Sequence, residues 1–321
     1  MSYVIAEIGF NHEGNMKLAS EMIKAASDSG ANAVKFQTFK AIDIALPTSP
    51  HYSAIKNGEM DFSQHQELFS IAKENAIDFI STPFSVNSIE LLEKIGVSAY
   101  KVASMDCTNH HLLKYISQTK KPVYLSTGMA ELSEISETLE YLESQNSGQI
   151  SILHCISIYP AEVDQLNLEM IPFLKHIFNI PVGYSDHYPG TKACLLANFL
   201  GAEILETHFT LDSSKEGGDH FHSADPSQLK ALIKDIEEFK SMRGSPKTIF
   251  QRKDRSFAQV FRRGVYSSKK LLKGDILKES DFILCRPESS FTPDDVEQLI
   301  GKKLCKDIEA YQPIESDVVR V

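Results

Sequence analysis

Short apolar runs alternate along this chain with segments in which apolar residues recur every three or four positions. Apolar runs bounded by polar residues are typical of buried parallel strands, and the longer spacing is typical of helices that bury one face. Eight runs precede residue 210: Tyr3–Ile8, Ala31–Gln37, Ile77–Thr82, Ser98–Ser104, Pro122–Thr127, Ile150–Cys155, Ile180–Ser185 and Ala202–Phe209. Helical spacing lies between most of them, as in Met16–Asp28, Gln66–Ala76, Ser88–Ile95 and Glu131–Leu142.

This alternation predicts an α/β protein with a parallel sheet and right-handed crossovers, and eight units close naturally into a (β/α)8 TIM barrel. An open doubly wound sheet is the alternative, but it usually carries a Gly-rich phosphate loop after its first strand. The turn after the first run, Glu7-Ile8-Gly9-Phe10-Asn11-His12, has no such loop. The last barrel helix is predicted from Pro226 to Met242, so we expect the barrel domain to occupy residues 1–245.

The pattern changes beyond the barrel. Arg243-Gly244-Ser245-Pro246 ends the helical spacing, and a polar linker is expected over residues 246–256. Residues 257–321 are expected to form a second, small domain of short runs and turns. Within it Lys273-Gly274-Asp275 predicts a tight turn and Thr292-Pro293-Asp294-Asp295 predicts the start of a helix.

Composition narrows the classes of protein. The 321 residues are 42% hydrophobic and 24% charged, as in an ordinary globular protein. The net charge of −10 disfavours nucleic acid as a partner, and the best apolar stretch, Cys194–Leu205, is too short for a membrane span. The N-terminus lacks the basic region of a signal peptide, and the five cysteines form no C-x-x-C pair. We therefore expect a cytoplasmic protein with no membrane partner.

Charge is unevenly distributed between the two parts of the chain. Residues 1–251 carry a net charge of −12, whereas residues 252–321 carry +2. A basic tail on an acidic body favours docking of one on the other, within or between chains. The alternative is that both surfaces are simply solvated.

Polar residues gather where the predicted strands end, and in a (β/α)8 barrel these ends form the mouth that holds the active site. Lys35 and Lys101 lie among apolar neighbours, where a lysine must reach solvent or meet an anion. Hydroxyls at Ser81-Thr82, Ser126-Thr127 and Ser185 add the donors that a phosphate or carboxylate accepts. Any single serine could be an ordinary strand-end or capping residue, and either lysine could instead form a Schiff base, as in aldolases.

His187 and His208 end the last two runs, with Asp186 and Asp219 nearby. Neutral imidazoles from neighbouring strands can converge on one divalent ion and leave positions open for water and substrate. Ordinary hydrogen bonds are the alternative role for strand-end histidines. Glu7, at the end of the first run, is the best candidate for a general base.

Several ordered blocks closely resemble the sialic acid synthase family. They are Ala6-Glu7-Ile8-Gly9-Phe10-Asn11-His12-Glu13-Gly14, Ala33-Val34-Lys35-Phe36-Gln37-Thr38, Ser81-Thr82-Pro83-Phe84-Ser85, Ala99-Tyr100-Lys101, Leu125-Ser126-Thr127-Gly128-Met129, Leu153-His154-Cys155, Gly183-Tyr184-Ser185-Asp186-His187, Glu206-Thr207-His208-Phe209-Thr210 and Gly217-Gly218-Asp219-His220. The tail resembles that family's antifreeze-like (SAF) domain, through Phe261-Arg262-Arg263-Gly264-Val265-Tyr266, Lys273-Gly274-Asp275 and Cys285-Arg286-Pro287. The match runs through the whole barrel in order.

The resemblance implies a transferase that condenses phosphoenolpyruvate with an N-acylated mannosamine-type sugar, giving a nine-carbon 2-keto acid and phosphate. It implies Mn²⁺, or Mg²⁺ or Co²⁺ in its place, with His187 and His208 as metal ligands that take part in catalysis beside Glu7. The residues matching the phosphoenolpyruvate site are Lys35, Thr82, Lys101, Ser104, Ser126 and Ser185. Those matching the sugar site are Gln37, Tyr159, Asp219 and Arg286. The family forms domain-swapped homodimers, in which Arg286 would reach the N-acyl group across subunits.

The chain departs from the family pattern at two places. Ile156-Ser157 stands where a polar residue is usual, and Glu288-Ser289-Ser290 replaces a Gly-rich turn, adding a negative charge near Arg286. Gly217–Pro226 resembles sialic or legionaminic acid synthases more than pseudaminic acid synthases. Alternatives are therefore a pseudaminic acid or other nonulosonate synthase, a Schiff-base lysine aldolase, and a carbohydrate-binding barrel without catalysis.

Overall fold

The computed structural model describes residues 2–245 and 253–319 and divides the chain into two compact units, Met1–Arg243 and Gly244–Val321. Most of the predicted linker, residues 246–256, lies outside the described residues. Each unit is considered by itself.

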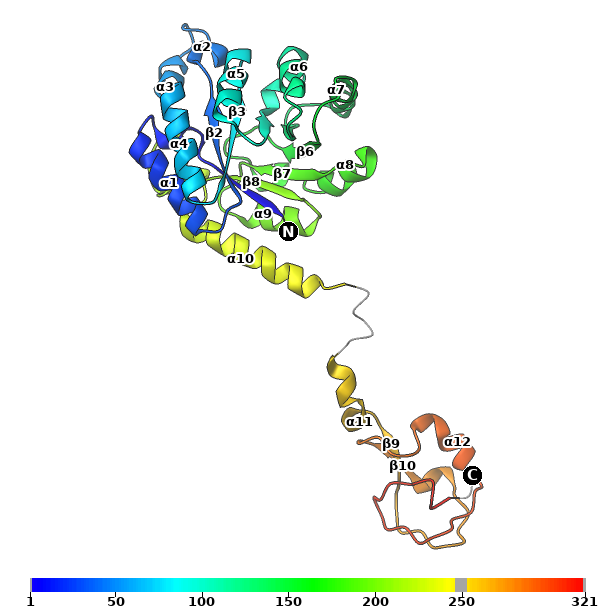
Figure 1. The fold of residues 1–321 in the computed structure, drawn as a ribbon. Coiled ribbons are helices and arrows are strands. Elements are labelled where there is room, and N and C mark those ends of the chain that lie inside the picture. The colour runs from blue at the N-terminus through cyan, green and yellow to red at the C-terminus, as the bar shows by residue number, and fades with distance from the viewer. Residues whose placement is uncertain (1, 246–252, 320–321) are drawn as a thin grey trace. The chain divides into compact units, whose positions relative to one another are not determined.

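The first unit is a closed barrel of eight parallel strands, which follow one another around the barrel in chain order (Figure 1). The strands are β1 (Tyr3–Glu7), β2 (Ala33–Thr38), β3 (Asp78–Pro83), β4 (Tyr100–Val102), β5 (Val123–Ser126), β6 (Ile150–Cys155), β7 (Val182–Asp186) and β8 (Ile204–His208). Each lies within or overlaps one predicted apolar run, so the (β/α)8 prediction is confirmed. The register that closes the barrel pairs Glu7 of β1 with Lys35 on one side and with His208 on the other.

Helices surround the strands. They are α1 (Met16–Asp28), α2 (Ala41–Ile44), α3 (Tyr52–Asn57), α4 (Phe62–Glu74), α5 (Val86–Ile95), α6 (His110–Gln118), α7 (Leu132–Ser144), α8 (Met170–Phe178), α9 (Lys192–Phe199) and α10 (Pro226–Arg243), with short 3-10 turns η1 (Gly9–His12), η2 (Ser104–Asp106), η3 (Val163–Gln165) and η4 (His220–His222). The predicted helix Met16–Asp28 has the observed bounds of α1, because the Asn15 side chain accepts hydrogen bonds from the first amides of the helix. The last barrel helix ends one residue beyond the predicted Met242.

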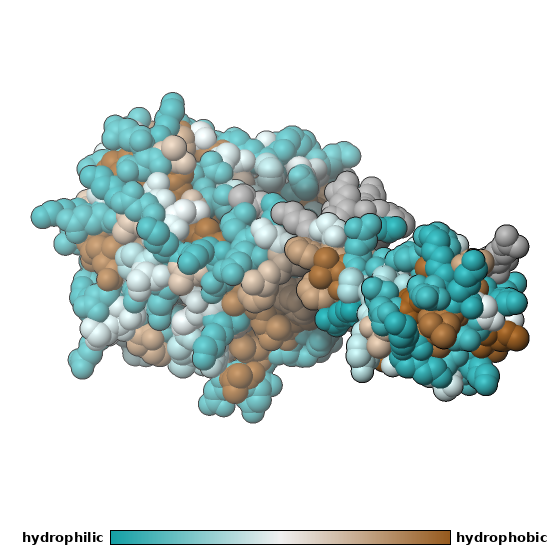
Figure 2. Space-filling model, turned by 90° about the horizontal axis from the view of Figure 1, so that it is seen from below, coloured by the Kyte–Doolittle hydropathy of each residue, from teal (hydrophilic) through white to brown (hydrophobic). Residues whose placement is uncertain are grey.

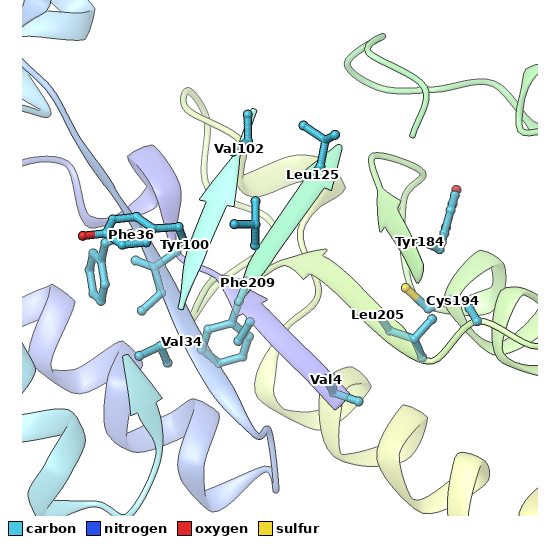
Figure 3. Packing of buried hydrophobic residues seen from close by; sticks show 14 of the residues in the cluster. Val4, Val34, Phe36, Tyr100, Val102, Leu125, Tyr184, Cys194, Leu205 and Phe209 are labelled. Carbon is cyan, nitrogen blue, oxygen red and sulfur yellow. The ribbon is translucent and has the colours of Figure 1, made fainter. Parts of the chain in front are cut away.

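Side chains on each strand alternate between the barrel interior and the layer of helices. Val34, Phe36, Tyr100 and Leu205 pack outward into the large core between strands and helices, shown in Figure 3. The alternate residues of the strands point into the barrel, where some of them form a small apolar cluster: Ile5, Ala33, Ile80, Leu153 and Ile204. Residues two positions further along these strands face the same interior and lie nearer the C-terminal mouth.

The barrel unit is also apolar on the side where α9 and α10 lie. Figure 2 views the molecule from below and shows apolar surface there. A hollow of about 860 Å³ at the N-terminal end of the barrel is lined by Phe199, Ile236, Phe239 and Met242 together with polar residues. Phe199 and Met242 are largely exposed. Within residues 2–245 and 253–319, no helix is long and apolar enough to cross a membrane.

The second unit contains two antiparallel strands, β9 (Gly264–Ser267) and β10 (Phe282–Cys285). Its helices and 3-10 turns are α11 (Ala258–Phe261), α12 (Val296–Leu299), η6 (Lys253–Phe257), η7 (Glu279–Asp281) and η8 (Pro293–Asp295). Its own core is formed by Val265, Leu271, Leu277, Leu299, Leu304, Ile308, Ile314 and Val319. The predicted turn at Gly274 is present with φ +97°, and Thr292 caps the predicted helix start.

Candidate active site

A cavity of about 420 Å³ opens at the C-terminal end of the barrel strands. Of the thirteen residues that the family resemblance assigns to the site, twelve line this cavity: Glu7, Lys35, Gln37, Thr82, Lys101, Ser104, Ser126, Tyr159, Ser185, His187, His208 and Asp219. Arg286 belongs to the second unit, where its guanidinium lies 5.1 Å from the centre of the Phe261 ring. In the same unit, Glu288 Oε1 lies 3.8 Å from a guanidinium nitrogen of Arg262.

Strand alternation explains which side chains reach the cavity. Lys35 and Gln37 follow Ala33 on the inward face of β2, and Thr82 follows Ile80 on β3. Ser81 and Asp186, which were grouped with the mouth residues in the sequence, point outward instead. Ser81 donates a hydrogen bond to the carbonyl of Phe36, and Asp186 accepts one from the Tyr184 hydroxyl.

Glu206 is the residue that sequence reasoning missed. It faces inward on β8 and is almost completely buried. Its Oε1 lies 3.6 Å from Lys101 Nζ and 3.8 Å from Lys35 Nζ, and it accepts a 2.8 Å hydrogen bond from Ser185 Oγ. A single buried carboxylate therefore lies between the two lysines that were expected to bind an anion.

Glu7 completes this charge network. Its Oε2 lies 2.9 Å from Lys35 Nζ, while its Oε1 accepts a hydrogen bond of 2.9 Å from Gln37 Nε2. Burial raises the pKa of Glu7, with Lys35 opposing the shift and Glu206 adding to it. Glu7 is thus a carboxyl group that can hold a proton more readily than an exposed glutamate.

The two lysines differ in their surroundings. Burial would lower the pKa of Lys35, but Glu206 and Glu7 outweigh that effect and raise it. Burial also acts on Lys101 and prevails there, so its pKa is lowered although Glu206 opposes the shift. For Glu206 burial is outweighed by Lys101 and Lys35, which lower its pKa. Lys35 is therefore held firmly as a cation, and Lys101 is the more easily deprotonated of the two.

Hydrogen-bond donors surround the lysines. Lys35 Nζ donates to Thr82 Oγ1 at 3.2 Å, and Ser104 Oγ accepts a 3.1 Å hydrogen bond from the amide of Gly128. A Cβ added to Gly128 would lie 2.3 Å from Ser157 Oγ and 2.8 Å from Ser104 Oγ, so the backbone can approach these hydroxyls this closely only at a glycine. Ser126 Oγ is buried and has no partner within the described residues, which leaves its hydroxyl free for a ligand.

His187 and His208 line the same cavity as this network. His187 Nδ1 lies 2.6 Å from the carbonyl oxygen of Ile156, so Nδ1 carries the proton and Nε2 keeps its lone pair. The rings of His187 and His208 are 5.3 Å apart, and the Tyr159 ring lies 4.0 Å from that of His187. Burial lowers the pKa of both histidines, most strongly for His208. Both rings are therefore neutral at pH 7, as metal ligands must be.

A third histidine extends this cluster. Ligand atoms of His208, Asp219 and His222 all lie within 4.8 Å of one another, and Asp219 Oδ2 is 3.5 Å from His208 Nδ1. Neither His208 Nδ1 nor either ring nitrogen of His222 has a hydrogen-bond partner in the described part of the chain, although all are buried. Imidazole nitrogens with one carboxylate suit Mn²⁺, Co²⁺ or a similar divalent ion. The residues present therefore fit a metal site.

The loop that carries Asp219 and His222 is fixed to the start of the barrel by Asn11. Asn11 Nδ2 donates to the carbonyl of Phe209 and to Ser223 Oγ, at 3.0 and 2.8 Å. Its Oδ1 accepts a 3.0 Å hydrogen bond from the amide of Asp219. One buried side chain thus ties the turn after β1 to the loop after β8 and holds the acidic residue at the mouth.

Comparison with known proteins identifies the family of this chain. Residues 22–248 match the model of the NeuB family. The chain is 36% identical over 315 residues to the N,N'-diacetyllegionaminic acid synthase of Campylobacter jejuni, covering 93% of this chain and 94% of the relative. It is 34% identical over 326 residues to the enzyme of the same name from Legionella pneumophila, covering 96% and 92%. The crystal structure of N-acetylneuraminic acid (sialic acid) synthetase from Leptospira borgpetersenii superposes with a TM-score of 0.76 at 34% identity, covering 79% of this chain and 89% of that one. This chain therefore belongs to the NeuB family.

Proposed function

We propose that this protein condenses phosphoenolpyruvate with an N-acylated mannosamine-type sugar and water, giving a nine-carbon 2-keto acid of the sialic or legionaminic type and phosphate. The observation that carries the proposal is the pairing of two sites in one cavity. Lys35 and Lys101 line it together with several hydroxyls, and so do the neutral histidines His187 and His208 with Asp219. Relatives named as legionaminic acid synthases at 34% and 36% identity support the substrate class.

The lysine side of the cavity is proposed to hold phosphoenolpyruvate through Lys35, Lys101 and the hydroxyls of Thr82, Ser104, Ser126 and Ser185. Both lysines already face Glu206, and Lys35 also faces Glu7. The substrate brings close to three negative charges, because the second phosphate pKa is about 6. The positive charges of Lys35 and Lys101 are nearly cancelled by Glu7 and Glu206, so a further positive charge is needed when the substrate enters.

A divalent cation, with Mn²⁺ the first choice and Mg²⁺ or Co²⁺ the alternatives, would supply that charge. His187 and His208 would hold it, with Asp219 adjacent. When bound, it would act as a Lewis acid on the open-chain sugar aldehyde. Gln37, Tyr159 and Asp219 line the same cavity and are proposed to position the sugar.

The proposed reaction forms one carbon–carbon bond and breaks one carbon–oxygen bond. The enol carbon C3 attacks C1 of the open-chain sugar, and positive charge develops at C2. Water adds to C2, and phosphate then leaves with cleavage of the C2–O bond, which gives the keto group. Glu7, with its raised pKa, is placed to hold or accept the proton that moves during ring opening or water addition. Lys35 and Lys101 stabilise the charge of the departing phosphate.

We propose that the second unit is an antifreeze-like domain and that the protein is a domain-swapped homodimer. Arg286 of one subunit would then reach the sugar's N-acyl group at the barrel of the other. The charges of −12 on residues 1–251 and +2 on residues 252–321 support such docking. So does the exposure of Phe257 and Phe261 beside the arginines of this unit. The cytoplasm is the proposed compartment, because all five cysteines are free.

The test is phosphate release from phosphoenolpyruvate with Mn²⁺. Parallel reactions contain N-acetylmannosamine, its 6-deoxy-2,4-diacetamido analogue or no sugar, each with and without EDTA. The proposal expects release that depends on the sugar and is abolished by EDTA, and the preferred sugar identifies the product class, pseudaminic acid precursors included. Release without sugar, or no release with any sugar, contradicts it.

The lowered pKa of Lys101 is also what a Schiff-base lysine needs, which keeps the aldolase as the second candidate. Borohydride reduction with substrate separates the two. An aldolase would be trapped covalently at the lysine and would be unaffected by EDTA, whereas the proposed synthase would show neither behaviour.

A further inference from the structure

His222 is an unusual residue for its position. It lies in η4, is only 2% exposed, and has no hydrogen-bond partner at either ring nitrogen within the described residues. Its ring lies 4.8 Å from that of His208 and 5.8 Å from that of Tyr159. It is not among the residues that line the cavity.

Other buried histidines of the barrel show what is normal in this protein. His65 contacts Thr38 Oγ1 and the carbonyl of Asp61, both at 2.9 Å. His220 contacts Thr210 Oγ1 at 2.7 Å and Glu13 Oε1 at 3.2 Å. A neutral imidazole has one donor and one acceptor, and burying either without a partner costs free energy. His222 alone among these three lacks both partners, so its environment is complete only with a group that the protein does not supply.

The neighbours of His222 indicate what that group is. Its ligand atom lies within 4.8 Å of those of His208 and Asp219, so two imidazoles and one carboxylate converge. The rings of His187, His208 and His222 form a row with neighbouring centres 5.3 and 4.8 Å apart. Rings that ligate one ion through nitrogens at about 2.1 Å take separations of this order.

We propose that His222 is a further protein ligand of the divalent cation that His187 and His208 hold. This inference rests on the metal site of the proposed function and extends its ligand set. A third imidazole would let the protein bind the cation before either substrate arrives, and one ion per chain would be bound. The sequence analysis, which considered only the ends of the last two strands, assigns two imidazole ligands, those of His187 and His208.

The first experiment uses the unaltered protein. Mn²⁺ is titrated in without substrates, and free Mn²⁺ is followed by electron paramagnetic resonance to obtain the dissociation constant and the number of ions per chain. Pulsed measurements on protein with ¹⁵N-labelled histidine then count the imidazole nitrogens coupled to bound Mn²⁺. The expected result is one ion with three coupled imidazoles. Two coupled imidazoles, or a second ion bound through His222, would overturn the proposal.

The second experiment compares His222→Phe, which keeps a ring but removes both nitrogens, with the smaller His222→Asn. The control is His65→Gln, a buried histidine far along the chain whose ring is already partnered. Both His222 variants should raise the Mn²⁺ dissociation constant about 10- to 100-fold and lose one coupled nitrogen, the range typical of losing a metal-site residue. The control should leave both values unchanged. An unchanged affinity in a folded His222 variant would show that water, not metal, completes this histidine.

These outcomes separate this inference from the proposed function. If sugar-dependent phosphate release is EDTA-sensitive and the His222 variants bind Mn²⁺ normally, only the third ligand is refuted. If the unaltered protein shows neither Mn²⁺ binding nor EDTA-sensitive release, the metal-dependent function itself is refuted.

Discussion

Glu206→Gln is the change that tests the charge network of the barrel most severely. Glutamine keeps the shape of the side chain and removes the only carboxylate that lies within 4 Å of both lysines in the described part of the chain. Lys35 keeps Glu7 at 2.9 Å, whereas Lys101 loses the carboxylate at 3.6 Å and has no other within 4 Å among the residues that the structure describes. The variant therefore leaves one buried ammonium group without a counter-charge.

The magnitude follows from the geometry. At an effective dielectric constant of about 20, each lysine–Glu206 pair at 3.6 or 3.8 Å corresponds to about 4–5 kcal/mol of Coulomb attraction. Relaxation and deprotonation of Lys101 reduce the net effect, and losing one partner of a buried ion pair typically costs about 3–5 kcal/mol. We expect the free energy of unfolding to fall by that amount, which corresponds to a decrease in Tm on the order of 10 °C for a unit of this size.

The assay is urea unfolding followed by circular dichroism in phosphate-free buffer at pH 7. The matched control is Glu203→Gln, just before the strand that carries Glu206. The Glu203 side chain is half-exposed and paired with Lys175, so the free energy of unfolding should change by no more than about 0.5 kcal/mol. Adding Lys101→Met to Glu206→Gln should recover much of the lost stability, because the uncompensated charge is gone. A Glu206→Gln variant within about 1 kcal/mol of the unaltered protein would refute the reasoning.

Three further predictions test other parts of the account. Lys101→Met should weaken phosphoenolpyruvate binding at least about tenfold, measured by calorimetry, because a charge-assisted contact is worth about 1.5–3 kcal/mol; unchanged affinity would remove Lys101 from the anion site. Burial, with His65 adding to it, lowers the pKa of His12 to about 4, below its unfolded value of 6.5, so its contribution to stability is complete above pH 6.5 and is lost as the pH falls toward 4. His12→Gln should therefore make the urea midpoint depend less on pH between 4.5 and 7. A variant whose midpoint depends on pH as steeply as that of the unaltered protein would count against this assignment. Gly128→Ala should keep the fold but weaken phosphoenolpyruvate binding, since the added Cβ would lie 2.3 Å from Ser157 Oγ and 2.8 Å from Ser104 Oγ and would displace both hydroxyls; a Ser104→Ala variant with the same defect would support the route through Ser104, and normal affinity in both would exclude it.

Much of the barrel could be predicted from hydrophobic periodicity because parallel strands buried on both faces are short apolar runs. The mouth followed from the rule that strand C-termini carry the chemistry. Reading only the last residues of each run, however, included Ser81 and Asp186, whose side chains point outward. It also omitted Glu206, two positions before His208 on the same inward face. Alternation along each strand corrects such errors: counted from the inward Ile80, Ser81 points outward, and counted from the inward Ile204, Glu206 points inward.

Other features depend on packing between distant segments. His222 follows Asp219 by three residues, but its approach to His208 depends on Asn11 fixing the loop after β8 to the turn after β1. No local pattern encodes that contact. Ser126 Oγ has no partner among the described residues, whereas Ser185 Oγ donates a hydrogen bond to Glu206. This difference also depends on how the strands meet in the closed barrel and not on the sequence of either strand.

The most direct test of the proposed condensation uses phosphoenolpyruvate labelled with ¹⁸O at the bridging oxygen between C2 and phosphorus. The protein is incubated with this substrate, Mn²⁺ and the preferred sugar, and the released phosphate and keto acid are analysed by mass spectrometry. Attack of C3 on the sugar followed by C–O cleavage predicts that the label leaves with phosphate, and only when sugar is present. Label retained in the keto acid would mean cleavage of the phosphorus–oxygen bond, and phosphate released equally without sugar would mean hydrolysis uncoupled from condensation; either result would contradict the account.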